Sequence, residues 1–142
     1  MARKFPKANV PRQHVISKGN HAHLLDLIKR GFFAHQKGEL DKAGSIYDQI
    51  LKIQPNYFDA LQLKAALKIQ LGLFAEAITL FDRALRINER NSALWFNRGM
   101  AFEGLNDESQ AIKCYEAAIS ISPDYLDAIK RKEELLAKRA CT

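Results

Sequence analysis

Four histidines and two cysteines are the side chains of this 142-residue chain best suited to metal binding or nucleophilic chemistry. His21 and His23 lie two residues apart, and on a helix two such side chains point about 200° from each other, so they cannot share a metal ion. Cys114 and Cys141 lack the CxxC or CxxH spacing of metal and redox sites. The spacing predicts no metal site and two free thiols in a reducing compartment.

The motifs of the common hydrolases, nucleotide-binding proteins and metalloproteases do not occur in the sequence. Cys114 falls at a helical position shared with Ile46 and Leu80, so we interpret it as a small core residue. The carboxylates of Asp107 and Glu108 lie at a turn, where helix capping explains them. We therefore expect no enzyme activity, no cofactor and no small-molecule substrate.

The net charge of +6 is concentrated at the two ends of the chain. Residues 1–30 hold seven Lys and Arg against one acidic residue, whereas residues 31–125 hold ten against twelve. A basic N-terminal arm over residues 1–23 is either a solvated tail or a contact for nucleic acid or an anionic membrane. The start of the chain has no apolar run typical of a secretory signal, and no apolar stretch is long enough to span a membrane. We expect a cytoplasmic protein.

An internal repeat identifies the elements that must position the other side chains. At a period of 34 residues the same residue classes return along the chain. The matching sets are Leu27, Leu61, Trp95 and Ile129; Gly31, Ala65 and Gly99; Ala43, Ala77 and Ala111; Tyr47, Phe81 and Tyr115; Ile50, Ala84 and Ala118; Ile53, Ile87 and Ile121; and Pro55, Glu89 and Pro123.

Apolar residues recur at helical spacing inside each repeat, and short polar breaks divide the repeat into two helices. We expect helices near 24–37, 42–53, 58–71, 75–87, 92–104, 108–121 and 125–139. Gly38 and Gly72 suit the left-handed end of a helix, and the third turn runs from Gly104 to Asp107. Asp41 and Asp107 are predicted N-caps. The small residues Gly31, Ala65 and Gly99 are expected to face the alanines of the second helices, Ala43, Ala77 and Ala111. The aromatic residues of the second helices are expected to fill the space between repeats.

These sets of positions resemble the tetratricopeptide repeat family. In the third repeat the residues of that signature are Trp95, Gly99, Phe102, Ala111, Tyr115, Ala118 and Pro123. Arg98 departs from its usual leucine, and Lys68 stands where the third repeat has Phe102. The resemblance implies an all-α, right-handed superhelical solenoid of three helical hairpins, at residues 24–57, 58–91 and 92–125, followed by a capping helix and tail at 126–142. That helix should bury Leu126, Ile129, Leu135 and Leu136 and keep its other face polar.

In stacked helical hairpins the first helix of each repeat lines a concave groove. We predict that a protein or peptide partner binds there, on a stripe of residues that is more apolar than a solvated face. The stripe comprises Ile28, Phe32, His35, Gln62, Leu63, Ala66, Ile69, Phe96, Asn97, Met100, Glu103, Lys130 and Arg131, and Glu134 closes it. Phe32, Phe96 and Met100 are the expected anchors. The alternative is that the stripe packs on itself or on the N-terminal arm.

By resemblance, Asn97 and Arg131 match two of the five positions that clamp a terminal carboxylate in chaperone-binding members of the family. Gln62, Ala66 and Asp127 occupy the other three, so chaperone C-termini are not the expected ligand. Three function classes remain open. The first is a protein-binding scaffold. The second is an accessory module of an enzyme, because the stretch from His35 to Leu61 resembles bacterial repeats that precede glycosyltransferase or sulfotransferase domains. The third is a protein that binds nucleic acid or a membrane surface through its basic ends.

Overall fold

The computed structural model describes residues 18–141, and every regular element among them is an α-helix. The seven helices are α1 (Lys18–Gln36), α2 (Leu40–Ile53), α3 (Phe58–Gln70), α4 (Phe74–Ile87), α5 (Ser92–Gly104), α6 (Glu108–Ile121) and α7 (Leu126–Ala140). α1 begins at Lys18, so the last six residues of the arm predicted at 1–23 belong to a helix. The rest of that arm, residues 1–17, lies outside the described residues. None of the helices of residues 18–141 is both long and apolar enough to cross a membrane.

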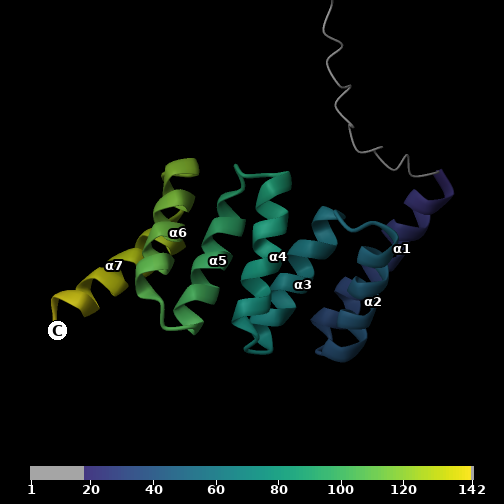
Figure 1. Ribbon diagram of the computed structural model, residues 1–142, viewed down its shortest axis with the longest axis horizontal. Coiled ribbons are helices and arrows are strands. Elements are labelled where there is room, and N and C mark those ends of the chain that lie inside the picture. Colours follow the sequence, from purple (N-terminus) through teal and green to yellow (C-terminus); the bar gives the residue numbers. More distant parts are fainter. Residues whose placement is uncertain (1–17, 142) are drawn as a thin grey trace, which may run out of the picture.

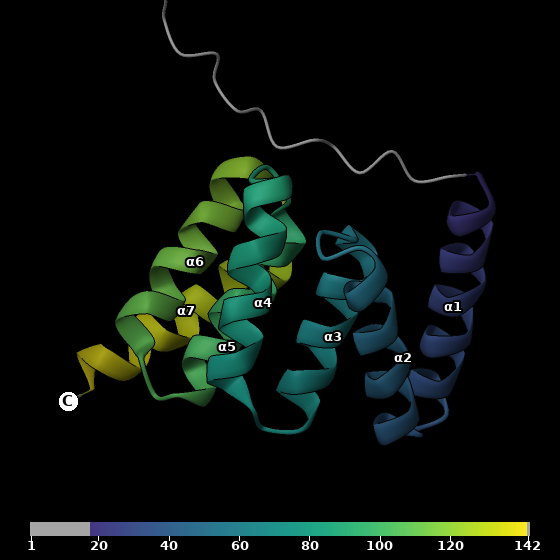
Figure 2. The ribbon, with the colours of Figure 1, turned by 45° about the vertical axis from the view of Figure 1, so that its right-hand side comes forward.

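The helices pair into three antiparallel hairpins, α1–α2, α3–α4 and α5–α6, and α7 follows alone. Figures 1 and 2 show the hairpins side by side in chain order along the long axis of the molecule. Each second helix also packs on the first helix of the next unit, α2 on α3, α4 on α5 and α6 on α7. This confirms the predicted solenoid, in which each hairpin is stabilised by its neighbours.

The turn inside each hairpin places one residue in the left-handed region. Gly38, Gly72 and Asn106 stand 34 residues apart and have φ angles of 79°, 73° and 59°. Asn106 therefore performs in the third turn the role that glycine performs in the first two, since asparagine tolerates this region better than most residues. The carboxylate of Asp107 caps α6 by accepting from the Gln110 amide at 3.2 Å. The prediction for Asp41 is wrong, because α2 begins at Leu40 and Asp41 lies inside it.

Two glycines of the first helices lie against tyrosine rings rather than against the alanines that we expected. A Cβ atom on Gly31 would lie 2.7 Å from Cε1 of Tyr47, and one on Gly99 would lie 2.5 Å from Cε1 of Tyr115. Both tyrosines are fully buried. Each ring thus packs closely on the first helix of its own hairpin, and a side chain larger than that of glycine at the point of contact would displace it.

The core consists of three clusters, one for each hairpin, and each cluster includes side chains of the next first helix. Leu67 joins the first cluster and Ala101 the second, while Ala128 and Leu135 of α7 join the third. α7 therefore covers the end of the stack as predicted, and of its four predicted core residues Leu135 is buried and Ile129 is half-buried. Leu126 and Leu136 are exposed, because α6 contacts the face of α7 that carries Ala128 and Leu135.

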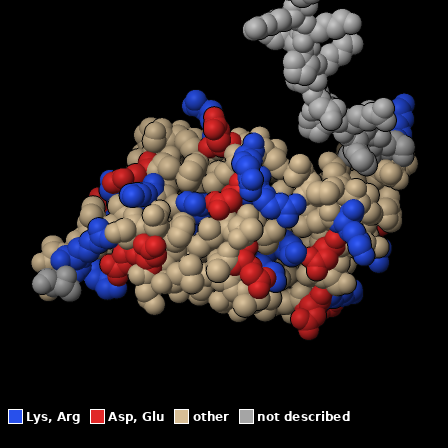
Figure 3. Space-filling view, viewed as in Figure 1, with Lys and Arg blue, Asp and Glu red and all other residues tan. Residues whose placement is uncertain are grey.

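Successive hairpins are also joined by ion pairs that repeat with the 34-residue period. Lys64 pairs with Asp48 at 2.5 Å, Arg98 with Asp82 at 2.8 Å and Lys132 with Glu116 at 3.2 Å. In each pair the cation comes from a first helix and the acid from the second helix of the preceding hairpin. This pairing gives Arg98 a structural role, and the same position holds a lysine in the neighbouring units, Lys64 and Lys132. Acidic and basic side chains lie close to one another over the face shown in Figure 3.

Candidate functional site

The predicted stripe runs across α1, α3, α5 and α7, and a hollow lies at each end of it. The first hollow, about 310 Å³ in volume, lies between α1 and α3. Its predicted members are Ile28, Phe32, Gln62 and Leu63. Lys29 and Asp59 also line it, although the sequence pattern did not single them out. Phe32 is 46% exposed, so its ring is available to a ligand.

The second hollow lies between α5 and α7 and has a volume of about 440 Å³. Its lining residues are Phe96, Met100, Asp127, Lys130, Arg131 and Glu134. All of these except Asp127 belong to the predicted stripe or its closing residue. The structure therefore combines an apolar floor from α5 with a charged wall from α7.

His35 and Glu103 belong to the stripe, but their side chains bind the tyrosines of their own hairpins. Nδ1 of His35 lies 3.3 Å from the Tyr47 hydroxyl, and the Tyr115 hydroxyl donates to Oε1 of Glu103. In the middle hairpin the same two positions hold Ile69 and Phe81, so a polar pair is replaced by an apolar one. These stripe residues thus hold the hairpin aromatics in place.

The Glu103 carboxylate lies between the Tyr115 hydroxyl and the Arg131 side chain of α7. Burial, together with the bond to Glu103, raises the pKa of Tyr115, so this hydroxyl remains a donor. Nη1 of Arg131 lies 3.4 Å from Oε2 of Glu103. Arg131 therefore has an intramolecular partner, which offsets part of the charge that it presents to the hollow.

Phe96 lies deeper than we expected from the sequence. Its ring centroid is 5.5 Å from that of Tyr115 and 5.2 Å from that of Tyr125. It is partly buried against the third core cluster, and Ile28 is buried in the first. These two residues stabilise the fold as well as lining hollows, so Phe32 and Met100 are the better probes of binding.

Five residues of the stripe line neither hollow: His35 and Glu103, which bind the tyrosines, and Ala66, Ile69 and Asn97. Asp59 and Asp127, which the prediction missed as lining residues, stand two repeat periods apart. Both lie in the first turn of a first helix. The repeat itself was thus a signal that could have identified them.

Among residues 18–141 no three His, Cys, Asp or Glu side chains lie close enough together to hold a metal ion. Burial raises the pKa of the Cys114 thiol, although the hydrogen bond that Nη1 of Arg98 donates to its sulfur at 3.2 Å opposes the shift. A buried thiol held protonated in this way is a poor nucleophile.

Comparison with known proteins agrees with this geometry. Two profiles described as tetratricopeptide repeat match residues 34–98 and 92–125, which together make up more than half of the chain. A TPR repeat-containing protein of Methanocaldococcus jannaschii is 31% identical over 81 residues, which are 57% of this chain and 24% of that protein. The chain spans between 11 and 24% of the length of the first curated relatives that it matches.

Solved structures share the fold at low sequence identity. The first TPR domain of Spaghetti (RPAP3), bound to an HSP90 peptide, superposes with a TM-score of 0.78 at 22% identity, covering 82% of this chain and 93% of that one. An O-GlcNAc transferase of Thermobaculum terrenum matches with a TM-score of 0.77 at 22% identity. That match covers 84% of this chain and 23% of the transferase.

Proposed function

This chain belongs to the tetratricopeptide repeat family, and on that premise we propose that it is a non-catalytic scaffold that binds a peptide segment of a partner protein. The segment lies in the groove formed by α1, α3, α5 and α7. Domains of this fold bind peptides, as the HSP90 peptide on Spaghetti (RPAP3) illustrates. The proposed partner is not a chaperone C-terminus, because three of the five positions that clamp the terminal carboxylate in chaperone-binding relatives hold other residues here.

The observation that carries the proposal is the pair of hollows at the two ends of the groove. Each combines exposed or half-buried apolar side chains with charged residues at the edge, which is the usual composition of a peptide-binding surface. Phe32 supports binding at one end and Met100 at the other. Lys130 adds a positive charge for which no intramolecular ion pair occurs among the described residues.

The test is selection of binding peptides followed by affinity measurement. Three interhelical spacings of about 8–10 Å correspond to about eight extended residues, so libraries of roughly that length are suitable. Selected peptides are titrated against the wild type and Phe32→Ala by fluorescence anisotropy. We expect Phe32→Ala to weaken binding about tenfold or more, because large apolar anchors dominate binding energy.

The neighbouring Phe33 provides a matched control. It is 58% exposed and lies under Nζ of Lys37, and it does not line the groove hollow. Phe33→Ala should leave the affinity unchanged. Equal loss of binding in both variants would indicate a non-specific apolar contact, and no loss in Phe32→Ala would remove the groove from consideration.

A second candidate function is an accessory module of a glycosyltransferase-type enzyme. The observation that favours it is the match to part of the Thermobaculum terrenum O-GlcNAc transferase. In that case the groove would present a protein substrate to a catalytic domain. Co-expression with a transferase domain should then raise glycosylation of substrates that bind the groove, and Phe32→Ala should abolish the increase.

We also propose a reducing compartment such as the cytoplasm. The buried Cys114 and the exposed Cys141 are both free thiols. A free thiol at the surface persists where the environment keeps it reduced. Thiol titration of the protein isolated from its native source should give two reactive groups after unfolding.

A further inference from the structure

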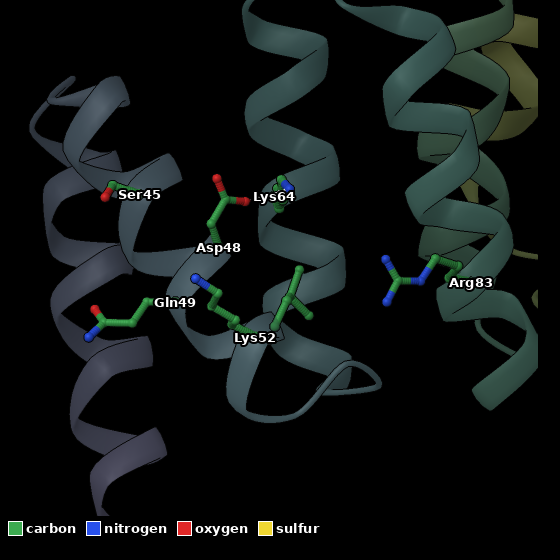
Figure 4. A pocket seen from close by; sticks show the side chains of 7 residues that line it. Ser45, Asp48, Gln49, Lys52, Lys64 and Arg83 are labelled. Atoms are coloured by element: carbon green, nitrogen blue, oxygen red, sulfur yellow. Dashed lines mark ion pairs between the residues drawn. The ribbon is translucent and has the colours of Figure 1, made fainter.

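A third hollow lies on the side of the second helices, away from the groove. It has a volume of about 590 Å³, larger than either groove hollow, and opens between α2, α3 and α4 (Figure 4). α2 packs on α3 and α3 on α4, whereas α2 and α4 form no packed interface with each other. The hollow therefore occupies the space where two successive second helices separate.

Hydrogen-bond donors dominate the lining of this hollow. Its residues are Ser45, Asp48, Gln49, Leu51 and Lys52 of α2, Lys64 of α3 and Arg83 of α4. Asp48 is the sole acidic residue of this lining, and Lys64 pairs with it. The charges of Lys52 and Arg83 remain, so the hollow is positive and suits an anion.

The guanidinium of Arg83 is held in place. Its Nη2 donates to the carbonyl oxygen of Pro55 at 2.5 Å, which leaves its other N–H groups as donors. Figure 4 shows Arg83 extending from α4 toward the side of the hollow that carries Lys52 and Lys64. An adjoining hollow of about 390 Å³ shares Arg83 and adds Asn56 and Arg86, which extends the positive region.

The repeat pattern separates these cations from the residues that maintain the fold. The ion pairs between hairpins recur in every unit, whereas the position of Arg83 holds Gln49 in the first hairpin and Ala117 in the third. Stacking of hairpins therefore does not require arginine there. A cation that hairpin stacking does not require at this position, placed at a hollow with N–H groups left over after its bond to the Pro55 carbonyl, points to a ligand.

We propose that this hollow binds an oxyanion of the phosphate class, with Arg83 supplying directed hydrogen bonds and Lys52 a second charge. Guanidinium groups match the geometry of phosphate oxygens, and lysine contributes a compact charge. Because the hollow is open to water, each single ion pair is weak, and a multiply charged ligand is required. The proposal is independent of the peptide groove, which lies on the first helices.

The test is an NMR titration at constant ionic strength with two probes, inorganic pyrophosphate and a short peptide that carries one phosphoserine. We expect saturable shifts confined to the amides of residues 45–52, 64 and 83. Arg83→Gln and Lys52→Gln should each weaken binding about fivefold to tenfold. Lys113→Gln is the matched control, since Lys113 is an exposed cation of a second helix that does not line the hollow, and it should have no effect.

Tighter binding of the pyrophosphate would identify a free small molecule as the source, and tighter binding of the phosphopeptide a modified partner protein. Thermal melting checks that each variant is folded. Shifts spread over all surface cations, or affinity unchanged in Arg83→Gln, would overturn the proposal. An absence of saturation with both probes would overturn it as well.

Discussion

Replacing Gly99 with alanine tests whether the contact between α5 and Tyr115 requires glycine. The new Cβ atom would lie 2.5 Å from Cε1, 2.9 Å from Cδ1 and 3.0 Å from Cζ of the tyrosine ring. Carbon atoms prefer separations of about 3.5–4.0 Å, so the ring would have to move by about 1 Å. It cannot move freely, because Tyr115 is fully buried and its hydroxyl donates to Glu103.

The expected magnitude is the difference between two opposing effects. Overpacking in a core costs about 1–3 kcal/mol, while alanine is favoured over glycine in a helix by about 1 kcal/mol. We expect Gly99→Ala to lower the free energy of unfolding by about 1 kcal/mol, which corresponds to a fall in Tm of roughly 3–6 °C. Gly99→Leu should cost more, since its side chain cannot fit between the helices.

Gly44→Ala provides the control because the nearest atom to its new Cβ, Cδ2 of Leu67, would lie 3.9 Å away. This variant should gain about 0.5–1 kcal/mol from helix propensity alone. Urea unfolding followed by circular dichroism measures both variants. If Gly99→Ala is stabilised to the same extent as Gly44→Ala, the reasoning about the tyrosine contact is wrong.

A double variant extends the test. In Gly99→Ala/Tyr115→Phe the ring loses its bond to Glu103 and is free to shift, as in the middle hairpin, where Ala65 and Phe81 share one core cluster. The two substitutions should therefore be non-additive by about 0.5 kcal/mol or more. Strict additivity would show that the hydroxyl does not restrict the ring.

Three further results are expected. Burial raises the pKa of Tyr47 to about 12, so the folded state binds the phenolic proton more tightly than the unfolded state. The resulting stability is present below about pH 10 and is lost between about pH 10 and 12. Tyr47→Phe should therefore reduce the fall of the urea midpoint over this pH range. Asp82→Asn leaves the half-buried Arg98 without its carboxylate and should lower the free energy of unfolding by about 1 kcal/mol. Asp26→Asn breaks an exposed ion pair 3.7 Å long and should change the free energy of unfolding by about a few tenths of a kcal/mol at most in the same urea denaturation assay. Asn106→Gly should raise Tm by removing the strain of a positive φ from a residue with a side chain, and Asn106→Ala should lower it, with about 1 kcal/mol between them.

Local features of the fold were predictable from the sequence because their causes are local. Helix bounds depend on apolar spacing and on residues such as Gly38 and Gly72, whose positive φ was expected and is observed. The same repeat placed Phe32 and Met100 on one face, and both line hollows in the structure. Asn106 could also have been recognised, since it stands one period after Gly72.

Side-chain partners across helices were less predictable. The sequence suggested that Gly99 faces an alanine, yet it lies against Tyr115, because the ring crosses the first helix to reach Glu103. Phe96 was expected to be an anchor of the groove, but the position of Tyr125 just before α7 brings the Phe96 ring into an aromatic cluster. Such contacts depend on how each helix rotates about its axis, which apolar spacing defines only to within a broad sector.

By itself the sequence determined the period of 34 residues, the helical hairpins, the turn residues and the family, since each follows from residue classes at short and regular separations. Only the tertiary structure decided which face of α7 is covered, which cation of a first helix pairs with which acid of the preceding hairpin, and where the hollows lie. The physical reason is that these features arise between helices. Asp48 and Lys64, or Lys52 and Arg83, are brought together by the stacking angle of successive hairpins, and that angle results from the packing of all the side chains between them.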